Sequence, residues 1–237
     1  MPDIKSNIES VKKRIEDACA RANRDPKDVI LLAATKDVPA DLIKEAIEAG
    51  ITHIGENRVQ EAAGKYELLK AKYPQVTWHM IGHLQTNKIG QALKIFDIIQ
   101  SVDSVRLADE IDQRYEVKGE RCEVFVEVNV SGEVQKFGVS EDGLEPLVRH
   151  ISRLNNIQLT GLMAVPPFFD EPQKARPYFK KLRDIKDKIS GLNLRNVELK
   201  YLSMGMTDDF EVAVEEGSNI VRIGRGIFGV EHKKTGG

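Results

Sequence analysis

Lys36 is the side chain in this sequence that is most clearly placed to carry out chemistry. It directly follows the apolar run 29–35 and precedes the turn-like Asp37-Val38-Pro39. A run this short and apolar is typical of a buried parallel strand, and α/β proteins keep their chemistry at the carboxyl ends of such strands. Lys36 is therefore either a solvated ammonium at the rim of a site or an amine that attacks a carbonyl group.

Other predicted strands also end in side chains that would meet at one mouth if the sheet closes into a barrel. They are Glu56-Asn57, His83, Asn129, Met163, Ser203 and Arg222. A shared mouth would bring these residues to Lys36, although they are far apart in the sequence.

Two glycine-containing segments predict a site for an anion. Segment 219–229 contains Gly224, Gly226 and Gly229 directly after an apolar run, and segment 203–209 adds hydroxyls and Gly205. Glycine lets the backbone approach an anion closely, and barrels often bind phosphate after their last two strands. Tight turns alone would also need glycine. Together with Lys36, the two segments indicate a ligand that carries both an aldehyde and a phosphate.

Three other groups of residues favour structural interpretations. His79 and His83 are four residues apart with no third ligand in view, so we predict no metal site. Asp208-Asp209 is interpreted as the cap of the following helix rather than as an acid/base pair. Cys19 and Cys122 are too isolated for a disulfide framework and are expected to be buried thiols.

Composition argues against several classes of partner. The 237 residues carry a formal net charge of -2, so there is no basic excess for nucleic acid. The chain start lacks the apolar core of a signal peptide, and no stretch approaches the roughly 18 apolar residues of a membrane helix. We expect a cytoplasmic protein whose partners are small molecules or other proteins.

Hydrophobic periodicity predicts an amphipathic helix over 4–22, followed by strict alternation of strands and helices. The expected strands are 29–35, 52–55, 77–81, 97–101, 123–130, 158–163, 199–203 and 220–224, and the expected helices between them are 39–49, 57–72, 86–93, 104–116, 140–153, 172–190 and 207–216. Such alternation implies parallel crossovers, and its length fits a (β/α)8 TIM barrel better than a doubly wound sheet. The prediction is one α/β barrel domain over 1–237 with an extra N-terminal helix.

Several motifs, taken in order from about residue 28 to 230, resemble those of a known family. They are Ala34-Thr35-Lys36, 55–61, 79–88, 161–165, 202–209 and Val221-Arg222-Ile223-Gly224. In these motifs the chain resembles the pyridoxal phosphate homeostasis proteins. That family is similar to the barrel of fold-type III pyridoxal phosphate enzymes such as alanine racemase, without their C-terminal β-domain.

The resemblance implies roles for particular residues. Lys36 would hold pyridoxal 5'-phosphate as a Schiff base, and Arg222 would face the pyridine nitrogen. Ser203, Gly224 and the backbone at Arg225 would hold the phosphate, although many relatives have Thr or Ser where this chain has Arg225. The same motifs assign Asn57, Met163 and Met204 to the cofactor site.

Three functions fit a lysine beside a phosphate site. The resemblance favours a protein that binds the cofactor without catalytic turnover and delivers it to apoenzymes. A racemase needs a second base, commonly a tyrosine, and none of the five tyrosines is an obvious one. A Schiff-base aldolase acting on a phosphorylated sugar satisfies the same residue chemistry, but the family motifs oppose it. We expect a monomer, because the racemase β-domain is absent.

Overall fold

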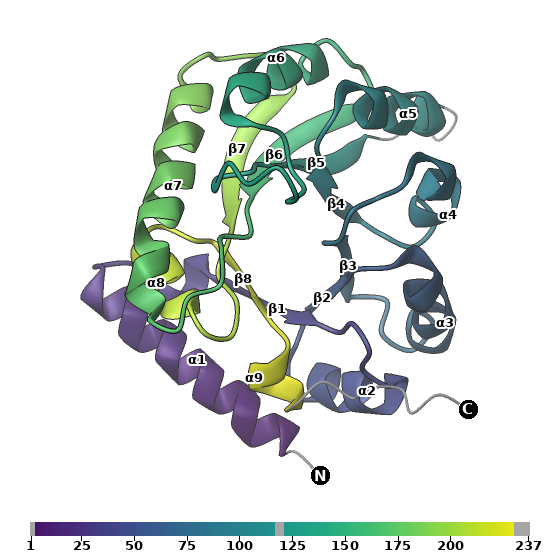
Figure 1. Ribbon diagram of the computed structural model, residues 1–237. Coiled ribbons are helices and arrows are strands. Elements are labelled where there is room, and N and C mark those ends of the chain that lie inside the picture. The colour runs from purple at the N-terminus through teal and green to yellow at the C-terminus, as the bar shows by residue number, and fades with distance from the viewer. Residues whose placement is uncertain (1–2, 117–120, 230–237) are drawn as a thin grey trace.

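The computed structural model describes residues 3–116 and 121–229, which form a closed barrel of parallel strands (Figure 1). The strands are β1 (Ile30–Ala34), β2 (His53–Glu56), β3 (Thr77–Met80), β4 (Ile98–Val102), β5 (Cys122–Glu127), β6 (Ile157–Met163), β7 (Val197–Ser203) and β8 (Ile220–Ile223). Each pairs with the next in parallel, and β8 closes on β1. The predicted (β/α)8 barrel is confirmed.

Helices surround the barrel on its outside (Figure 1). The α-helices are α1 (Ile4–Arg21), α2 (Ala40–Glu48), α3 (Val59–Leu69), α4 (Ile89–Ala92), α5 (Val105–Glu116), α6 (Glu141–Ile151), α7 (Arg176–Ser190), α8 (Phe210–Glu215) and α9 (Arg225–Phe228). Short 3-10 helices cover Pro26–Asp28, Thr86–Lys88 and Pro172–Ala175. Each helix predicted from the sequence is present, with ends shifted by a few residues.

One strand is shorter than predicted. The sequence favours a strand over 123–130, but β5 ends at Glu127. Beyond it the side chain of Asn129 accepts a hydrogen bond from the Gly132 N–H at 2.9 Å and donates to the Glu133 carbonyl at 2.8 Å. These local bonds fold the chain into a compact loop, because an Asn side chain offers the backbone an alternative to strand pairing.

The apolar core lies in two places. A large cluster fills the space between the sheet and the helices, and a small one lies inside the barrel, where Leu32, Phe125, Met163 and Ile220 meet. Adjacent strand residues point to opposite sides of the sheet, so both sides of each strand are buried. The runs that look uniformly apolar in the sequence therefore divide between these two cores.

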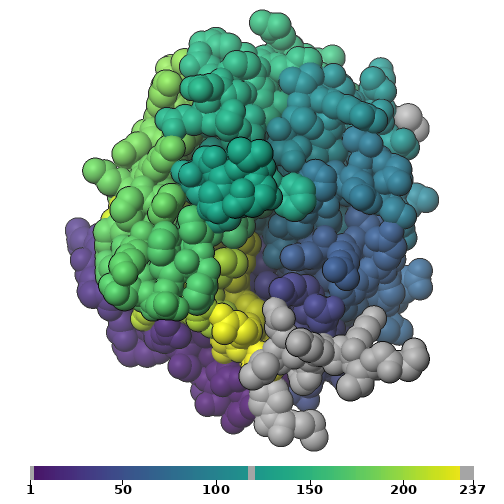
Figure 2. Space-filling view, in the orientation of Figure 1, coloured from purple at the N-terminus to yellow at the C-terminus, as the bar shows by residue number. Residues whose placement is uncertain are grey.

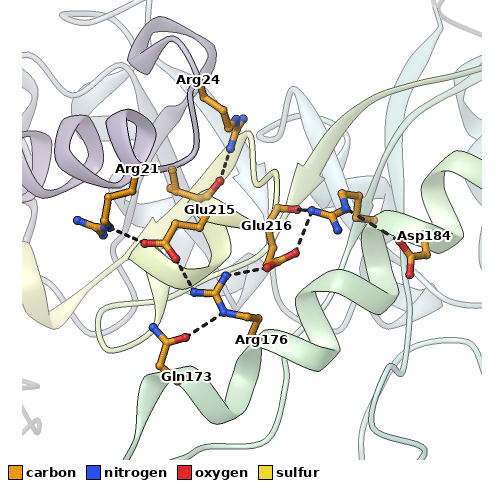
Figure 3. A network of polar contacts seen from close by, with 9 residues as sticks. Arg21, Arg24, Gln173, Arg176, Asp184, Glu215 and Glu216 are labelled. Carbon is orange, nitrogen blue, oxygen red and sulfur yellow. Dashed lines mark hydrogen bonds and ion pairs between the residues drawn. The ribbon is translucent and has the colours of Figure 1, made fainter.

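Helix α1 packs against α8, α9 and α2. Its predicted apolar stripe is buried, at Ile4, Ile8, Val11, Ile15 and Cys19. Ion pairs join its end to the barrel helices: Arg21 contacts Glu215 at 2.7 Å, and Arg176 bridges Glu215 and Glu216 (Figure 3). The extra N-terminal helix is thus an integral layer of the barrel wall.

Among the described residues, no helix has the length and hydrophobicity needed to cross a membrane. Both cysteines are buried and unbonded to each other, in agreement with the expectation of structural thiols.

Candidate cofactor site at the barrel mouth

A pocket of about 230 Å³ opens at the carboxyl ends of β1, β7 and β8. It brings together four of the residues predicted from the sequence, namely Lys36, Arg222, Gly224 and Arg225. The rest of its lining is Ala34, Val38, Phe168, Met206, Thr207, Asp208, Phe228 and Gly229. An amine, two guanidiniums and a glycine turn in one pocket are a donor set suited to an aldehyde that carries an anionic group.

Lys36 stands in a tight turn directly after β1. The next residue, Asp37, has a φ of 57°, a left-handed conformation that Asp adopts more readily than most residues. The backbone N–H of Asp37 donates to Glu61 Oε1 at 2.6 Å, which ties the turn to α3. The chain thus reverses immediately after Lys36 and leaves its side chain at the pocket.

A buried cluster of charged side chains hydrogen-bonds to this turn. Lys65 Nζ, on α3, donates to the Thr35 carbonyl at 2.6 Å, to Glu56 Oε1 at 2.7 Å and to Glu61 Oε1 at 2.6 Å. The Thr35 hydroxyl also donates to Glu56 Oε1. Burial raises the pKa of Glu56, and the neighbouring Lys65 opposes that rise. The cluster fixes the backbone on both sides of Lys36, and sequence analysis did not identify Lys65 as part of the site.

Arg222 projects from β8 into the barrel and is only 4% exposed. Its Nη1 donates to Ser203 Oγ at 2.7 Å and its Nη2 to the Ala164 carbonyl at 2.9 Å. Burial lowers the pKa of Arg222 to about 10, while the charges of Glu127 and Asp209 oppose the fall. The guanidinium is therefore a fixed cation at the inner end of the pocket.

Glu127 is the counter-charge of Arg222 inside the barrel. Burial raises its pKa to about 7 from 4.5, with Arg222 opposing the rise and Asp103 adding to it. Because the folded protein holds this proton to higher pH than the unfolded chain, folding stability declines as the pH rises from about 4.5 to about 7.

We expect Glu127→Gln to remove that decline. Between about pH 4 and about pH 8, the unfolding free energy of the variant should rise relative to the parent by up to roughly 3 kcal/mol. Denaturant titration at both pH values measures the difference, and Glu9→Gln at an exposed position of α1 is the control for the substitution type. A constant difference across this pH range would contradict the assignment.

The turn between β8 and α9 forms the outer wall of the pocket. A side chain at position 226 would come within 2.8 Å of Ile223 Cγ2, so glycine is required there. The Gly226 N–H donates to Thr207 Oγ1 at 3.3 Å, and Arg225 is paired with Asp208 at 2.5 Å. Thr207 therefore brings a hydroxyl to the pocket, whereas the Arg225 guanidinium is engaged by a carboxylate.

The other four predicted site residues lie outside the pocket lining. Ser203 is fully buried and bonds Arg222 and Gln100 inside the barrel. Met163 belongs to the apolar cluster there, while Met204 lies in the core outside the sheet. Asn57 follows β2 and is exposed. Its carbonyl oxygen would lie 2.4 Å from a Cβ atom at position 82, so its backbone packs closely against Gly82. Their roles at a cofactor remain predictions.

Two further expectations concern the pair His79 and His83 and the helix cap at Asp208-Asp209. His79 is fully buried inside the barrel and bonds His53 and Gln100, whereas His83 is partly exposed and lies 3.4 Å from Asp103, so the two side chains have different partners. Asp209 does occupy the N-cap position directly before α8, but its carboxylate accepts from the Met206 N–H at 2.6 Å rather than from a helix N–H, and Asp208 binds Arg225. The predicted helix cap was therefore wrong in its hydrogen bonds, because Asp209 bonds the preceding turn and Asp208 bonds Arg225 of α9.

The loop after β5 lies in front of the barrel and carries Phe137 (Figures 1 and 2). The Phe137 ring stacks on His83, with 4.4 Å between ring centroids. Phe168, from the proline-containing loop after β6, is 75% exposed beside the pocket. Phe168 thus brings the loop after β6 into the pocket lining.

Comparisons with known proteins agree with this geometry. Residues 4–232 match the model of the alanine racemase N-terminal domain family. An alanine racemase from Clostridium difficile has the same fold, with a TM-score of 0.72 at 14% identity, over 98% of this chain and 60% of that one. The protein is therefore a barrel of the alanine racemase N-terminal class.

Nearer relatives narrow this class. A pyridoxal phosphate homeostasis protein from Aquifex aeolicus is 44% identical over 94% of this chain and 96% of its own. The structure of PipY from Synechococcus elongatus, with PLP bound, has a TM-score of 0.79 at 33% identity, over 91% of this chain and 100% of that one. The chain belongs to the pyridoxal phosphate homeostasis proteins.

Proposed function

We propose that this protein binds pyridoxal 5'-phosphate reversibly as a Schiff base on Lys36, and that it stores and delivers the cofactor. The observation that carries the proposal is that Lys36, Arg222 and the β8–α9 turn line one pocket. The PLP-bound structure of the Synechococcus relative supports it. The neutral Lys36 amine would supply the nitrogen of the Schiff base, and its two hydrogens would leave with the aldehyde oxygen as water.

Different residues of the pocket would bind different parts of such a ligand. Gly224 and the backbone at Arg225 would bind the phosphate, and the Thr207 hydroxyl is available to donate, since its oxygen accepts from Gly226 N. Arg222 would face the ring nitrogen. Asp208 competes with the phosphate for the Arg225 guanidinium, so this departure from relatives with a hydroxyl there need not strengthen binding.

Arg222 also bears on what the bound cofactor can do. A guanidinium is always a donor and a cation, so it disfavours a proton on a neighbouring ring nitrogen. The cofactor supplies an electron sink for carbanion chemistry, and that sink is weaker when the nitrogen is unprotonated. This favours storage over turnover.

The competing function is that of an amino-acid racemase, which the fold itself favours. Racemisation needs a second base opposite the lysine. All five tyrosines lie within the described residues, and none is among the residues that line the pocket. We therefore propose a protein without catalytic turnover. We also propose that it acts in the cytoplasm as a monomer and meets apoenzymes transiently.

A spectroscopic titration tests cofactor binding. Protein saturated with pyridoxal 5'-phosphate should show a near-visible absorption band that persists through desalting and disappears on treatment with borohydride. Lack of that band in the saturated protein would contradict both the carrier and the racemase.

A turnover assay separates the two. We expect the loaded protein to leave L-alanine unconverted while it transfers its cofactor to an added apoenzyme. Conversion of L-alanine to D-alanine that depends on Lys36 would establish the racemase instead.

A further inference from the structure

A continuous chain of hydrogen bonds runs through the inside of the barrel from the pocket toward its opposite end. Arg222 Nη1 contacts Ser203 Oγ at 2.7 Å, and Ser203 Oγ contacts Gln100 Oε1 at 2.6 Å. Gln100 Nε2 contacts His79 Nδ1 at 2.9 Å, and His79 Nε2 contacts His53 Nδ1 at 2.9 Å. Five side chains from β2, β3, β4, β7 and β8 take part. The three in the middle are fully buried.

The guanidinium of Arg222 and the amide of Gln100 together set the direction of every bond in this hydrogen-bond chain. A guanidinium has no acceptor, so Ser203 Oγ must accept from it. Gln100 Oε1 can only accept, so the Ser203 hydroxyl donates to it, and the Gln100 amide nitrogen, which can only donate, donates to His79 Nδ1. His79 Nδ1 therefore lacks a proton, and His79 Nε2 carries one that it donates to His53 Nδ1. A donor must face an acceptor, so the guanidinium and the orientation of the Gln100 amide fix each link.

We propose that Ser203, Gln100 and His79 are positioning residues that hold the Arg222 guanidinium at the pocket, and that the Gln100 amide in turn keeps His79 and His53 neutral with their protons on Nε2. The two guanidinium nitrogens are fixed by Ser203 and by the Ala164 carbonyl. Glu127 and Asp209 act on Arg222 through their charge. Charge attracts a guanidinium, but directed hydrogen bonds orient its plane.

Burial acts in the same direction at the far end of the chain. It lowers the pKa of His79 to about 3 and also lowers that of His53. A proton added to His53 Nδ1 would face the His79 Nε2–H, with two donors and no acceptor between them. The neutral state is therefore required by geometry as well as by burial.

The first test needs no substitution and no cofactor. In 15N-labelled protein, NMR distinguishes protonated from unprotonated ring nitrogens of each histidine. We expect Nε2 to be protonated and Nδ1 unprotonated in both His79 and His53 at neutral pH. A proton on Nδ1 of His79 would overturn the proposal. This result is independent of whether the protein binds pyridoxal 5'-phosphate.

A pair of substitutions at Gln100 tests the two halves of the hydrogen-bond chain, toward Ser203 and toward His79. Gln100→Glu keeps an acceptor for Ser203 but has no donor for His79, so His79 Nδ1 should gain a proton. Gln100→Leu removes both bonds. If His79 Nδ1 remains unprotonated in Gln100→Glu, the assigned direction is wrong.

The role at Arg222 is tested in the loaded protein, and this arm rests on the proposed function. We expect Gln100→Leu to shift the absorption maximum of bound pyridoxal 5'-phosphate, because Ser203 loses the acceptor that orients it and so holds Arg222 less firmly, while borohydride still fixes one cofactor per chain. Gln100→Glu should shift it less. Unchanged spectra in Gln100→Leu with intact trapping would overturn the positioning role, whereas failed trapping in the parent protein would instead contradict the proposed function.

Discussion

Lys36→Ala is expected to eliminate retention of pyridoxal 5'-phosphate through desalting. Lys36 is the one lysine among the residues that line the pocket, and an alanine there cannot form a covalent bond to the aldehyde. The phosphate contacts at Gly224, Arg225 and Thr207 would remain, so the variant should still bind the cofactor weakly and reversibly. Absorbance of the desalted protein and a binding titration measure the two effects separately.

Lys88→Ala is the matched control for this substitution. Lys88 belongs to a 3-10 helix that follows β3, outside the pocket lining. The control should keep the band and its loss on borohydride treatment. A band of full height in Lys36→Ala would show that another lysine binds the aldehyde.

Lys65→Met is expected to be the most destabilising of the substitutions considered. Lys65 is buried, with its ammonium between Glu56 and Glu61, and Glu56 is fully buried. Removing one partner of a buried ion pair leaves an uncompensated charge, which typically costs about 3–5 kcal/mol. The substitution also removes the bond to the Thr35 carbonyl, so the turn at Lys36 should lose its support and cofactor binding should weaken.

Denaturant unfolding with two comparison variants tests this expectation. Lys13→Met breaks an exposed ion pair with Asp17 on α1 and should change stability little, because surface pairs contribute little. Lys65→Met combined with Glu56→Gln should recover part of the loss, since the buried carboxylate is then neutral. A double variant as unstable as Lys65→Met would argue that packing, not charge, dominates at this position.

The barrel could be predicted because its signal is local and repeated. Each strand is a short apolar run, each helix a periodic one, and their alternation leaves few topologies. The ends of β5 and the cap of α8 could not be predicted, because they depend on which backbone groups Asn129 and Asp209 reach. In both cases the side chain has several backbone groups within a few residues that it could bond.

The site was partly predictable for a related reason. Lys36, Arg222, Gly224 and Arg225 could be found because the carboxyl ends of parallel strands meet. Ser203 and Met204 are adjacent, so one faces the barrel interior and the other the outer core, and a motif assigns both to the site without separating them. Lys65 and Gln100 act through partners in other elements, and nothing in their neighbouring residues marks them.

Mass spectrometry of the borohydride-reduced, loaded protein tests the central claim most directly. After digestion, the mass of the reduced cofactor should be found on the peptide that contains Lys36, at close to one equivalent per chain. Modification of another lysine, such as Lys88 or Lys136, with Lys36 unmodified would contradict this assignment and, with it, the role proposed for the pocket.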